Sequence, residues 1–307
     1  MEAARTLRHL LRAPGPVRLV GAHDCLTAAL VERAGFEAVW ASSLEVSASL
    51  GLPDSELICI EEMAQVVYRM AHATPLPVVV DLDTGYGSVR HIYRAVQELE
   101  RRGAAGICLE NKIFPKQNSF AAAGHVLASA AEFSERIHAA GSARRSPDFL
   151  ILARTEALVV GRELGRALED AAHFEEAGAD GIVLHSKQGP ATDFHAFLGR
   201  WEGRLPVIVI PTHYPGLSLT RLREWGASGV IYANIVLRTI VGAVSNNLSR
   251  LHDGALLEDL HELAPIGDVF GLQATMYLHD RVGDLEIARE SGALLRTNGA
   301  RIRTRSG

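Results

Sequence analysis

The fold of this chain is decided by one stretch, Val78-Val-Val-Asp-Leu-Asp-Thr-Gly-Tyr-Gly-Ser88. Its apolar run is bounded by Pro77 and by glycines, which indicates a buried strand that ends near Asp81. Residues two apart on a strand point the same way, so Asp81 and Asp83 are predicted to aim at one spot. Two buried carboxylates repel unless a cation or a proton separates them, and Mg²⁺ prefers such oxygen ligands. A pair of solvated turn aspartates is the alternative that the DxDxG pattern alone would favour.

Strand-like apolar runs recur on both sides of this stretch, with helical patterns between them. The predicted strands are 18–24, 36–43, 78–81, 104–110, 148–154, 179–185, 205–211 and 228–234. The predicted helices lie within 1–18, at 26–34, in a segment that ends at 72, and at 89–102, 164–177, 193–201 and 219–225, with a loop at 44–55. This alternation predicts the α/β class and a (β/α)8 TIM barrel, whose chemistry lies at the C-terminal ends of the strands. A doubly wound open sheet is the alternative fold, but its GxGxxG fingerprint is missing.

The bulk composition fits one globular domain of barrel size. The chain has 307 residues, of which 48% are hydrophobic and 22% charged, enough for a single large core. We expect the barrel at about 16–245, a C-terminal helical extension at about 246–290 and a flexible tail at about 291–307. The segment after Asn234 is so apolar that its exposure would be costly, so either the chain's own barrel or an oligomer must cover it.

Charge, hydropathy and cysteine usage exclude several classes of protein. The net charge of −5 provides no basic field, so nucleic acid is not an expected partner. No apolar run approaches the roughly 18 residues that cross a bilayer, and the N-terminus lacks a signal-peptide core, so no membrane partner is expected. The cysteines Cys25, Cys59 and Cys108 lack metal-ligand spacing and are predicted to be core thiols in a reducing compartment. A cytoplasmic protein is therefore predicted.

Polar residues of chemical interest follow almost every predicted strand. Because the strands of a barrel end on one rim, we assign these residues to one shared pocket. They are Asp24, Ser42, Asp81 with Asp83, Glu110, Arg154, His185, Pro211-Thr212 and Asn234. The carboxylates of Asp81, Asp83 and Glu110 can surround one Mg²⁺, some directly and some through water.

Basic residues are predicted to face these carboxylates. Arg154 and His185 follow two later strands, and Lys112 and Lys116 follow the strand that carries Glu110. Such a set facing a metal can hold a phosphoryl or carboxylate oxyanion, so the implied ligand is a small polyanion chelated by Mg²⁺. Each residue alone also fits a structural role, namely an ion pair, a rim histidine or a solvated loop charge. Their coincidence on one rim favours a site.

A long connection, 113–128, is rich in Ala, Gly and Ser and contains Phe114-Pro-Lys-Gln-Asn-Ser119. Loops of this length in a barrel are commonly lids, with a disordered surface loop as the alternative. A lid suits phosphoryl transfer, because water hydrolyses a transferring phosphoryl group wherever it can reach it.

Several motifs together resemble the phosphoenolpyruvate mutase family, within the isocitrate lyase superfamily. The resemblance runs from about Pro16 to Gln273 and is far more specific in combination than in any one motif. The motifs are Trp40-Ala-Ser-Ser-Leu44, Ser47-Ala-Ser-Leu-Gly51, Pro53-Asp-Ser55, Asp81-Leu-Asp-Thr-Gly-Tyr-Gly87, Glu110-Asn-Lys-Ile-Phe-Pro-Lys-Gln-Asn-Ser119, Ala153-Arg-Thr-Glu156 and His185-Ser-Lys187. The resemblance implies a Mg²⁺-dependent barrel whose eighth helix is swapped between subunits of a homodimer or homotetramer. It also implies an isomerase that interconverts phosphoenolpyruvate and phosphonopyruvate, forming the P–C bond of natural phosphonates.

The same resemblance implies roles for individual residues. Asp81 would be the direct Mg²⁺ ligand, with Asp83 and Glu110 in its water-mediated shell. The pyruvyl end would be held or walled by Trp40, Ser42 and the backbone amides of Ser43 and Leu44. The phosphoryl group would be surrounded by Lys116, Asn118, Arg154 and His185, with Asp54 near the reacting centre and Ser119 beside Asn118 on the substrate. The implied mechanism is dissociative, with a metaphosphate-like species passing from the enol oxygen to carbon.

The lid sequence separates this chain from other members of the superfamily. Lyases carry Lys-Lys-Cys-Gly-His there, and the absence of a thiol disfavours a C–C lyase. Phosphonopyruvate hydrolase has Thr where Asn118 stands, which favours the mutase. Two departures from the mutase pattern keep alternatives open: Asn111 replaces an Asp beside the metal shell, and Ala41-Ser42-Ser43 replaces Gly-Ser-Gly. The alternatives are a variant acting on an analogous enolpyruvyl oxyanion such as an arsenate-based one, the hydrolase, or a barrel that binds its ligand without turnover.

Overall fold

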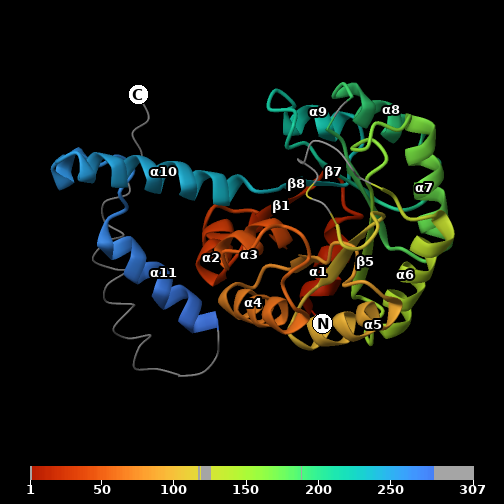
Figure 1. Ribbon diagram of the computed structural model, residues 1–307, viewed down its shortest axis with the longest axis horizontal. Helices are drawn as coiled ribbons and strands as arrows, with labels where there is room; N and C mark the ends of the chain where they lie inside the picture. The colour runs from red at the N-terminus through yellow and green to blue at the C-terminus, as the bar shows by residue number, and fades with distance from the viewer. Residues whose placement is uncertain (1, 117, 119–125, 188, 280–307) are drawn as a thin grey trace.

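The computed structural model describes residues 2–116, 118, 126–187 and 189–279, and its strands close into a parallel barrel surrounded by helices (Figure 1). Each strand pairs with the next one in sequence, and β8 pairs with β1. The strands are β1 (Val17–Ala22), β2 (Ala38–Ala41), β3 (Val78–Asp81), β4 (Gly106–Glu110), β5 (Leu150–Thr155), β6 (Gly181–His185), β7 (Val207–Ile210) and β8 (Gly229–Tyr232). The predicted (β/α)8 TIM barrel is therefore confirmed.

Helices precede, separate and follow the strands, and those between strands cover the outside of the barrel (Figure 1). They are α1 (Glu2–Leu10), α2 (Cys25–Arg33), α3 (Ser43–Ser49), α4 (Ile60–Ala73), α5 (Val89–Arg101), α6 (Ala130–Ala143), α7 (Leu164–Glu176), α8 (Thr192–Arg200), α9 (Leu219–Glu224), α10 (Ile235–His252) and α11 (Ile266–His279), with a 3₁₀ turn η1 (Leu257–Asp259). Among the described residues, no helix is long and apolar enough to span a bilayer.

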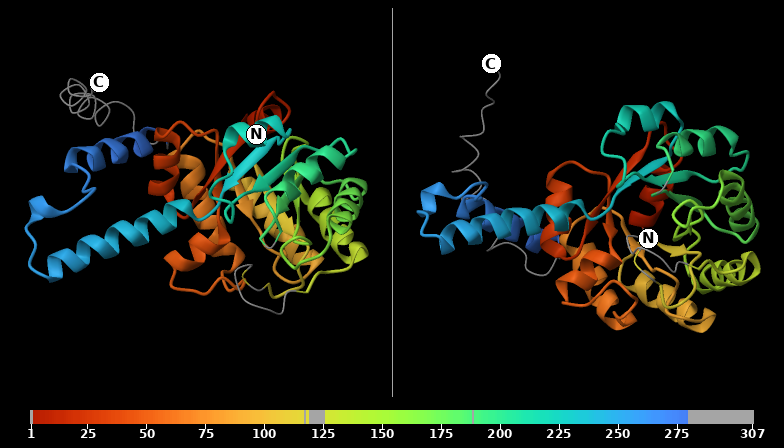
Figure 2. Two further views of the ribbon diagram at one scale, coloured as in Figure 1. Left: turned by 90° about the horizontal axis from the view of Figure 1, so that it is seen from above. Right: turned by 45° about the horizontal axis from the view of Figure 1, so that its top comes forward.

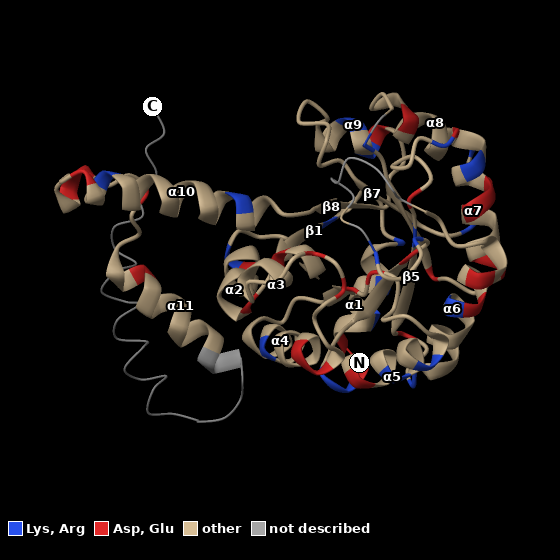
Figure 3. Ribbon diagram, viewed as in Figure 1, with Lys and Arg blue, Asp and Glu red and all other residues tan. Residues whose placement is uncertain are grey.

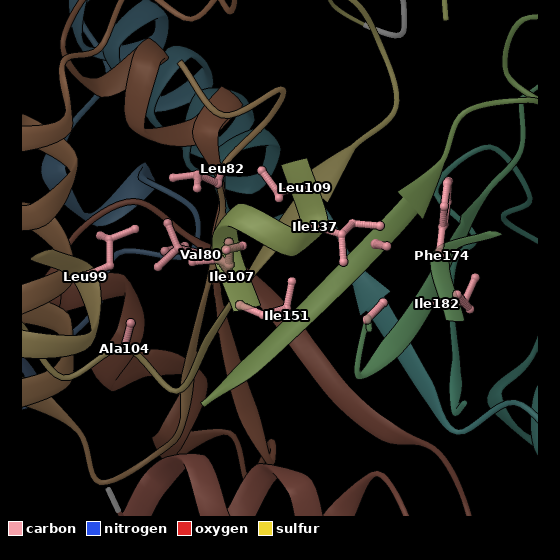
Figure 4. Packing of buried hydrophobic residues seen from close by; sticks show 14 of the residues in the cluster. Val80, Leu82, Leu99, Ala104, Ile107, Leu109, Ile137, Ile151, Phe174 and Ile182 are labelled. Atoms are coloured by element: carbon pink, nitrogen blue, oxygen red, sulfur yellow. The ribbon is translucent and has the colours of Figure 1, made fainter. Parts of the chain in front are cut away.

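Side-chain alternation along each strand divides the core into two layers. The barrel interior holds Val79, Cys108, Leu152 and Val183, and the buried Leu7 of α1 belongs to the same cluster. The outer layer packs between strands and helices: Ile107 and Ile151 are neighbours in the β4–β5 register and belong to one cluster with Ile137 and Leu99 of the helices (Figure 4). Two residues beyond the inner positions, the same faces end in Asp81, Glu110, Arg154 and His185. The side-chain alternation that fills the barrel interior with apolar residues therefore also points these polar residues toward the C-terminal opening of the barrel.

Two helices were not predicted from the sequence. α3 occupies the predicted loop at 44–55, where Ser42 caps it by accepting a hydrogen bond from Glu45 N. α6 follows the lid and is capped in the same way by Ser129, but its Ala, Gly and Ser residues weaken the apolar periodicity. The prediction of core thiols is wrong for Cys59, which is exposed at the start of α4, whereas Cys108 is buried.

The last two helices project from the barrel (Figure 2). α10 leaves the end of β8 as one long helix, and none of its residues is buried within the described part of the chain. α11 then returns to pack against α2 and α4. Charged residues are frequent on α6 and α7, whereas α10 and α11 carry few along most of their length (Figure 3). The predicted flexible tail at 291–307 lies outside the described residues.

Candidate functional site

One cavity lies at the C-terminal ends of the strands and collects most of the predicted site residues. Its lining comprises Trp40, Ser42, Ser43, Leu44, Asp54, Asp81, Lys116, Asn118, Arg154, His185, Ile210, Thr212, Ala233 and Asn234. Asp24 was predicted to join this pocket, but it is exposed and instead caps α2, where its Oδ1 accepts a hydrogen bond from Thr27 N at 2.8 Å. Ser119 lies outside the described residues.

The acidic side of the cavity is formed around Ser43. Its hydroxyl lies 2.7 Å from Asp83 Oδ1 and 3.3 Å from Asp81 Oδ2, so both carboxylates converge as predicted. The reason differs from the one predicted, because β3 ends at Asp81 and Asp83 reaches the site from a left-handed turn with φ of 51°. Burial raises the pKa of Asp83 to about 7, with Asp81 and Asp54 adding to the effect and Lys116 opposing it.

Arg154 joins the carboxylates of two neighbouring strands. Its Nη1 lies 3.4 Å from both oxygens of Asp81, and its Nη2 pairs with Glu110 Oε2. The other oxygen of Glu110, Oε1, is buried and accepts no hydrogen bond from the described residues, with Lys112 Nζ at 3.7 Å. An unsatisfied buried carboxylate oxygen is costly, so this position suits a cation or a metal-bound water.

A second buried carboxylate, Glu156, holds the basic residues of the site. Glu156 Oε1 lies 2.9 Å from Arg154 Nε and 3.0 Å from His185 Nδ1, and its Oε2 lies 3.2 Å from Lys112 Nζ. Burial alone would raise the pKa of Glu156, but His185, Lys112 and Arg154 together lower it well below its ordinary value. The sequence pattern alone indicated no role for this residue, although it ends the motif Ala153-Arg-Thr-Glu156.

The described part of the lid closes the acidic side. Lys116 Nζ lies 2.6 Å from both Asp54 Oδ1 and Asp83 Oδ1, and Asn118 Nδ2 lies 2.5 Å from Asp54 Oδ2. The base of the lid is fixed by backbone pairing, since Ile113 N donates to Val126 O at 3.1 Å. Lys116 and Asn118 therefore reach the cavity from the loop, as predicted.

Glu56 is a further residue that the sequence analysis missed. Its carboxylate accepts hydrogen bonds from the backbone N–H groups of Thr84, at 2.9 Å, and Lys116, at 2.8 Å. It thereby ties the lid to the turn that carries Asp83. Glu56 lies in an irregular segment with a positive φ of 55°, and no periodic pattern marks it in the sequence.

The sequence pattern predicted that Asn111 lies beside the metal site. The structure places it elsewhere. Its Nδ2 donates to Asp170 Oδ2 at 2.9 Å, and its Oδ1 accepts from Glu156 N at 2.9 Å. The reason is strand alternation: Glu110 faces the barrel interior, so the next residue faces the helix layer and α7. The replacement of Asp by Asn at position 111 therefore does not change the set of carboxylates around the metal site.

The donor set fits a hard divalent cation. Asp81, Asp83 and Glu110 offer carboxylate oxygens from neighbouring elements, and Glu110 Oε1 has no hydrogen-bond donor among the described residues. In that part of the chain, no three His, Cys, Asp or Glu side chains converge closely enough to enclose an ion by themselves. Mg²⁺ usually takes one or two carboxylates and completes its octahedron with water and substrate.

Comparison with known proteins gives consistent similarities. The family model described as Phosphoenolpyruvate phosphomutase matches residues 7–252. The chain is 41% identical over 273 residues to a phosphoenolpyruvate phosphomutase of Streptomyces hygroscopicus, covering 88% of this chain and 87% of that protein. The solved phosphoenolpyruvate phosphomutase of Streptomyces platensis subsp. rosaceus superposes with a TM-score of 0.86 at 43% identity, covering 91% of this chain and 97% of that one. A phosphonopyruvate hydrolase solved with oxalate and Mg²⁺ superposes with a TM-score of 0.83 at 32% identity, with the same coverage.

Proposed function

The chain belongs to the phosphoenolpyruvate phosphomutase family, and we propose that it is an isomerase that interconverts phosphoenolpyruvate and 3-phosphonopyruvate. The family resemblance predicted from its motifs is confirmed. One observation carries the assignment of chemistry: the carboxylates of Asp81 and Asp54 line a single cavity together with the basic residues Arg154, His185 and Lys116. Such a site can hold both oxyanions of an enolpyruvyl phosphate and stabilise the charge that moves between them.

The proposed cofactor is Mg²⁺, held directly by Asp81 and through water by Asp83 and Glu110. When bound, the ion would supply the positive charge that stabilises the enolate oxygen. The raised pKa of Asp83 supports this proposal, because burial, with a smaller effect of the neighbouring carboxylates, favours a proton there, and a divalent cation could balance the same charge. The hydrolase structure with Mg²⁺ and oxalate supports the same choice of metal.

The pyruvyl end of the substrate is assigned to the wall formed by β2 and the start of α3. Ser42 and the backbone N–H groups of Ser43 and Leu44 would bind the carboxylate, since the first amides of a helix make no intrahelical bond. Trp40, which is buried below them, would pack against the flat enolpyruvyl group.

The phosphoryl group is assigned to Arg154, His185, Lys116 and Asn118. In the forward reaction the bond from phosphorus to the enol oxygen breaks and a bond from phosphorus to the methylene carbon forms, so no proton is gained or lost. The basic residues would hold the three phosphoryl oxygens while the pyruvyl group moves beneath them. Asp54, which contacts both Lys116 and Asn118, would keep these lid residues at the reacting centre. The closed lid would exclude the water that turns transfer into hydrolysis.

The test is ³¹P NMR of phosphonopyruvate incubated with the protein and Mg²⁺. We expect phosphoenolpyruvate to accumulate, because the equilibrium of such an exchange favours the P–O ester over the P–C bond. Inorganic phosphate with pyruvate would identify a hydrolase, and an unchanged spectrum would identify a barrel that binds without turnover. Omission of Mg²⁺ with a chelator should abolish the conversion.

Hydrolysis of phosphonopyruvate is the second candidate, because a hydrolase of known structure is 32% identical to this chain. Asn118 argues against hydrolysis. Its amide donates a hydrogen bond to Asp54 and can also face a phosphoryl oxygen, where it would take the place of an attacking water. We expect Asn118→Thr to raise the share of inorganic phosphate among the products. If Asn118→Thr gives the same product ratio as the unchanged protein, Asn118 does not determine which of the two reactions occurs.

The partner surface is assigned to α10, and we propose a homodimer or homotetramer in which this helix packs on another subunit. Val241 and Leu248 are 56% and 60% exposed on one apolar stripe, which is costly in water. Light scattering after size-exclusion chromatography should give an oligomer for the unchanged protein and a smaller species for Val241→Glu with Leu248→Glu. Asn246→Glu, on the opposite side of the helix, is the control and should leave the mass unchanged.

A further inference from the structure

Glu156 lies at the centre of the basic half of the site without facing the cavity itself. It follows β5 directly, and it is 0% exposed. Its backbone is fixed from behind, because its N–H donates to Asn111 Oδ1 and the neighbouring Thr155 hydroxyl donates to Asp170 Oδ2 at 2.8 Å. Burying a carboxylate costs free energy unless its charge is paired. The contacts of its two oxygens therefore indicate its role.

Those contacts reach three basic residues of the site. Oε1 is shared between Arg154 Nε and His185 Nδ1, and Oε2 faces Lys112 Nζ. Arg154 and His185 both line the cavity, whereas Lys112 is buried beside Glu110. Without Glu156, these basic groups would repel one another, and the ring of His185 would lose its hydrogen-bond partner at Nδ1.

We propose that Glu156 is a positioning residue, which fixes the tautomer and ring orientation of His185 and the guanidinium plane of Arg154 toward the phosphoryl group. The role in turnover rests on the proposed function, but the effect on His185 does not. An ionised carboxylate only accepts hydrogen bonds, so Nδ1 of His185 must carry the proton that joins it to Glu156. Nε2 is then the ring nitrogen that remains for the cavity and its ligand.

The geometry of Arg154 follows from the same anchor. Arg154 Nε forms an ion pair with Glu156 Oε1 at 2.9 Å, without the angle of a hydrogen bond, and the two terminal nitrogens contact Asp81 and Glu110. A planar guanidinium held at one edge presents its other nitrogens in a fixed direction, which lowers the entropy cost of binding an oxyanion. Glu156 therefore acts on both groups through one carboxylate.

The first test needs no activity. In ¹⁵N-histidine-labelled protein, the His185 ring signals, assigned by their loss in His185→Gln, should show Nδ1 protonated in the unchanged protein. In Glu156→Gln the amide can also donate to the ring, so the signals should shift toward the other tautomer. Nδ1 found without a proton in the unchanged protein would overturn the proposal, as would identical ring signals in both proteins.

The second test compares kinetic constants for conversion of phosphonopyruvate to phosphoenolpyruvate. Glu156→Gln should lower kcat by about 100-fold, in line with the loss of an orienting carboxylate, while KM stays equal or falls because positive charge is left unbalanced. Glu156→Asp keeps the charge and should recover part of kcat, which keeps the test valid if Glu156→Gln folds poorly. Glu163→Gln, the same change at an exposed position of the same connection, is the control and should match the unchanged protein.

The outcomes of the two tests are separable. If Glu156→Gln lowers only the melting temperature and leaves kcat, KM and the ring signals of the folded protein unchanged, Glu156 is structural and the proposal fails. If the unchanged protein makes no phosphoenolpyruvate, the proposed function fails, while the NMR measurement still decides whether Glu156 sets the tautomer of His185.

Discussion

The two halves of the cavity are built from different kinds of structure. On the β4–β6 side, Glu110, Arg154 and His185 lie at the ends of strands in the barrel register, and Glu156 and Lys112 are buried among them. We call this the strand half. On the other side, Asp54, Asp83, Lys116 and Asn118 lie on turns and loops that meet through side-chain contacts. We call this the loop half.

This difference predicts that the two halves contribute to different steps of the reaction. The strand half should keep its geometry without the lid, because its charges are paired with one another at or just beyond the strand ends. The loop half is complete only when Lys116 and Asn118 are in place, and Glu56 is the residue that connects them to the turn of Asp83. Binding should therefore depend mainly on the strand half, and the exclusion of water and the rate of transfer mainly on the loop half.

The largest expected effect comes from Asp81, the carboxylate shared by both halves. Asp81→Ala removes the contact to Arg154 and the convergence with Asp83, so turnover should fall by about 10⁴-fold or more. Mg²⁺ should also no longer raise the melting temperature. Asp24→Ala is the matched control, since this aspartate follows a strand on the same rim but caps α2: the variant should lose about 1 kcal/mol of stability and keep its turnover. Full activity of Asp81→Ala would contradict the assignment of the site.

A smaller effect is expected from the loop half. Asn118→Ala removes the contact to Asp54 and should lower kcat for P–C bond formation by about 100-fold, with little change in KM. Kinetics of the isolated step, followed by rapid quench, would measure it. If KM rises and kcat is unchanged, Asn118 belongs with the binding residues and the division between the halves is wrong.

The third effect concerns pH and the metal-free protein. The pKa of Asp83 is about 7 in the folded protein and has an ordinary value of 3.8, so the folded state binds a proton that the unfolded state releases. This contribution to stability is complete below about pH 3.8 and is lost as the pH rises through about 7. In the presence of a chelator, the melting temperature should therefore fall between pH 5 and 8, and less so in Asp83→Asn. Parallel curves for the two proteins would show that Lys116 keeps Asp83 ionised throughout.

The strand half was accessible from the sequence, and the loop half only in part. Alternation within short apolar runs places Asp81, Glu110, Arg154 and His185 at strand ends, because a barrel fixes both the direction and the register of its strands. Asp24 has the same position in the pattern, but its side chain satisfies the N-terminus of α2. A strand-end position therefore does not distinguish a site residue from a helix cap.

Residues that act through other residues left little trace in the sequence. Glu156 is two residues from Arg154, so strand alternation places both on the same face. Nothing in a single sequence indicates that this carboxylate contacts basic groups from three segments. Glu56 depends on a left-handed turn and on hydrogen bonds to backbone groups, which have no side-chain signature. Lys116 and Asn118 were identified from the resemblance of the lid and not from periodicity.

The smallest effect on catalysis is expected at Asn111, which the sequence analysis placed near the metal and the structure places against α7. Asn111→Asp would set a second carboxylate beside Asp170 and should cost about 1–3 kcal/mol of stability, while Mg²⁺ affinity by calorimetry stays unchanged. Asp170→Asn in the same protein should restore much of that loss, because the amide and the carboxylate then exchange places. A tighter Mg²⁺ complex in Asn111→Asp would instead mean that charge at this position reaches the metal through Glu156, and that the strand half is not insulated from its supporting layer.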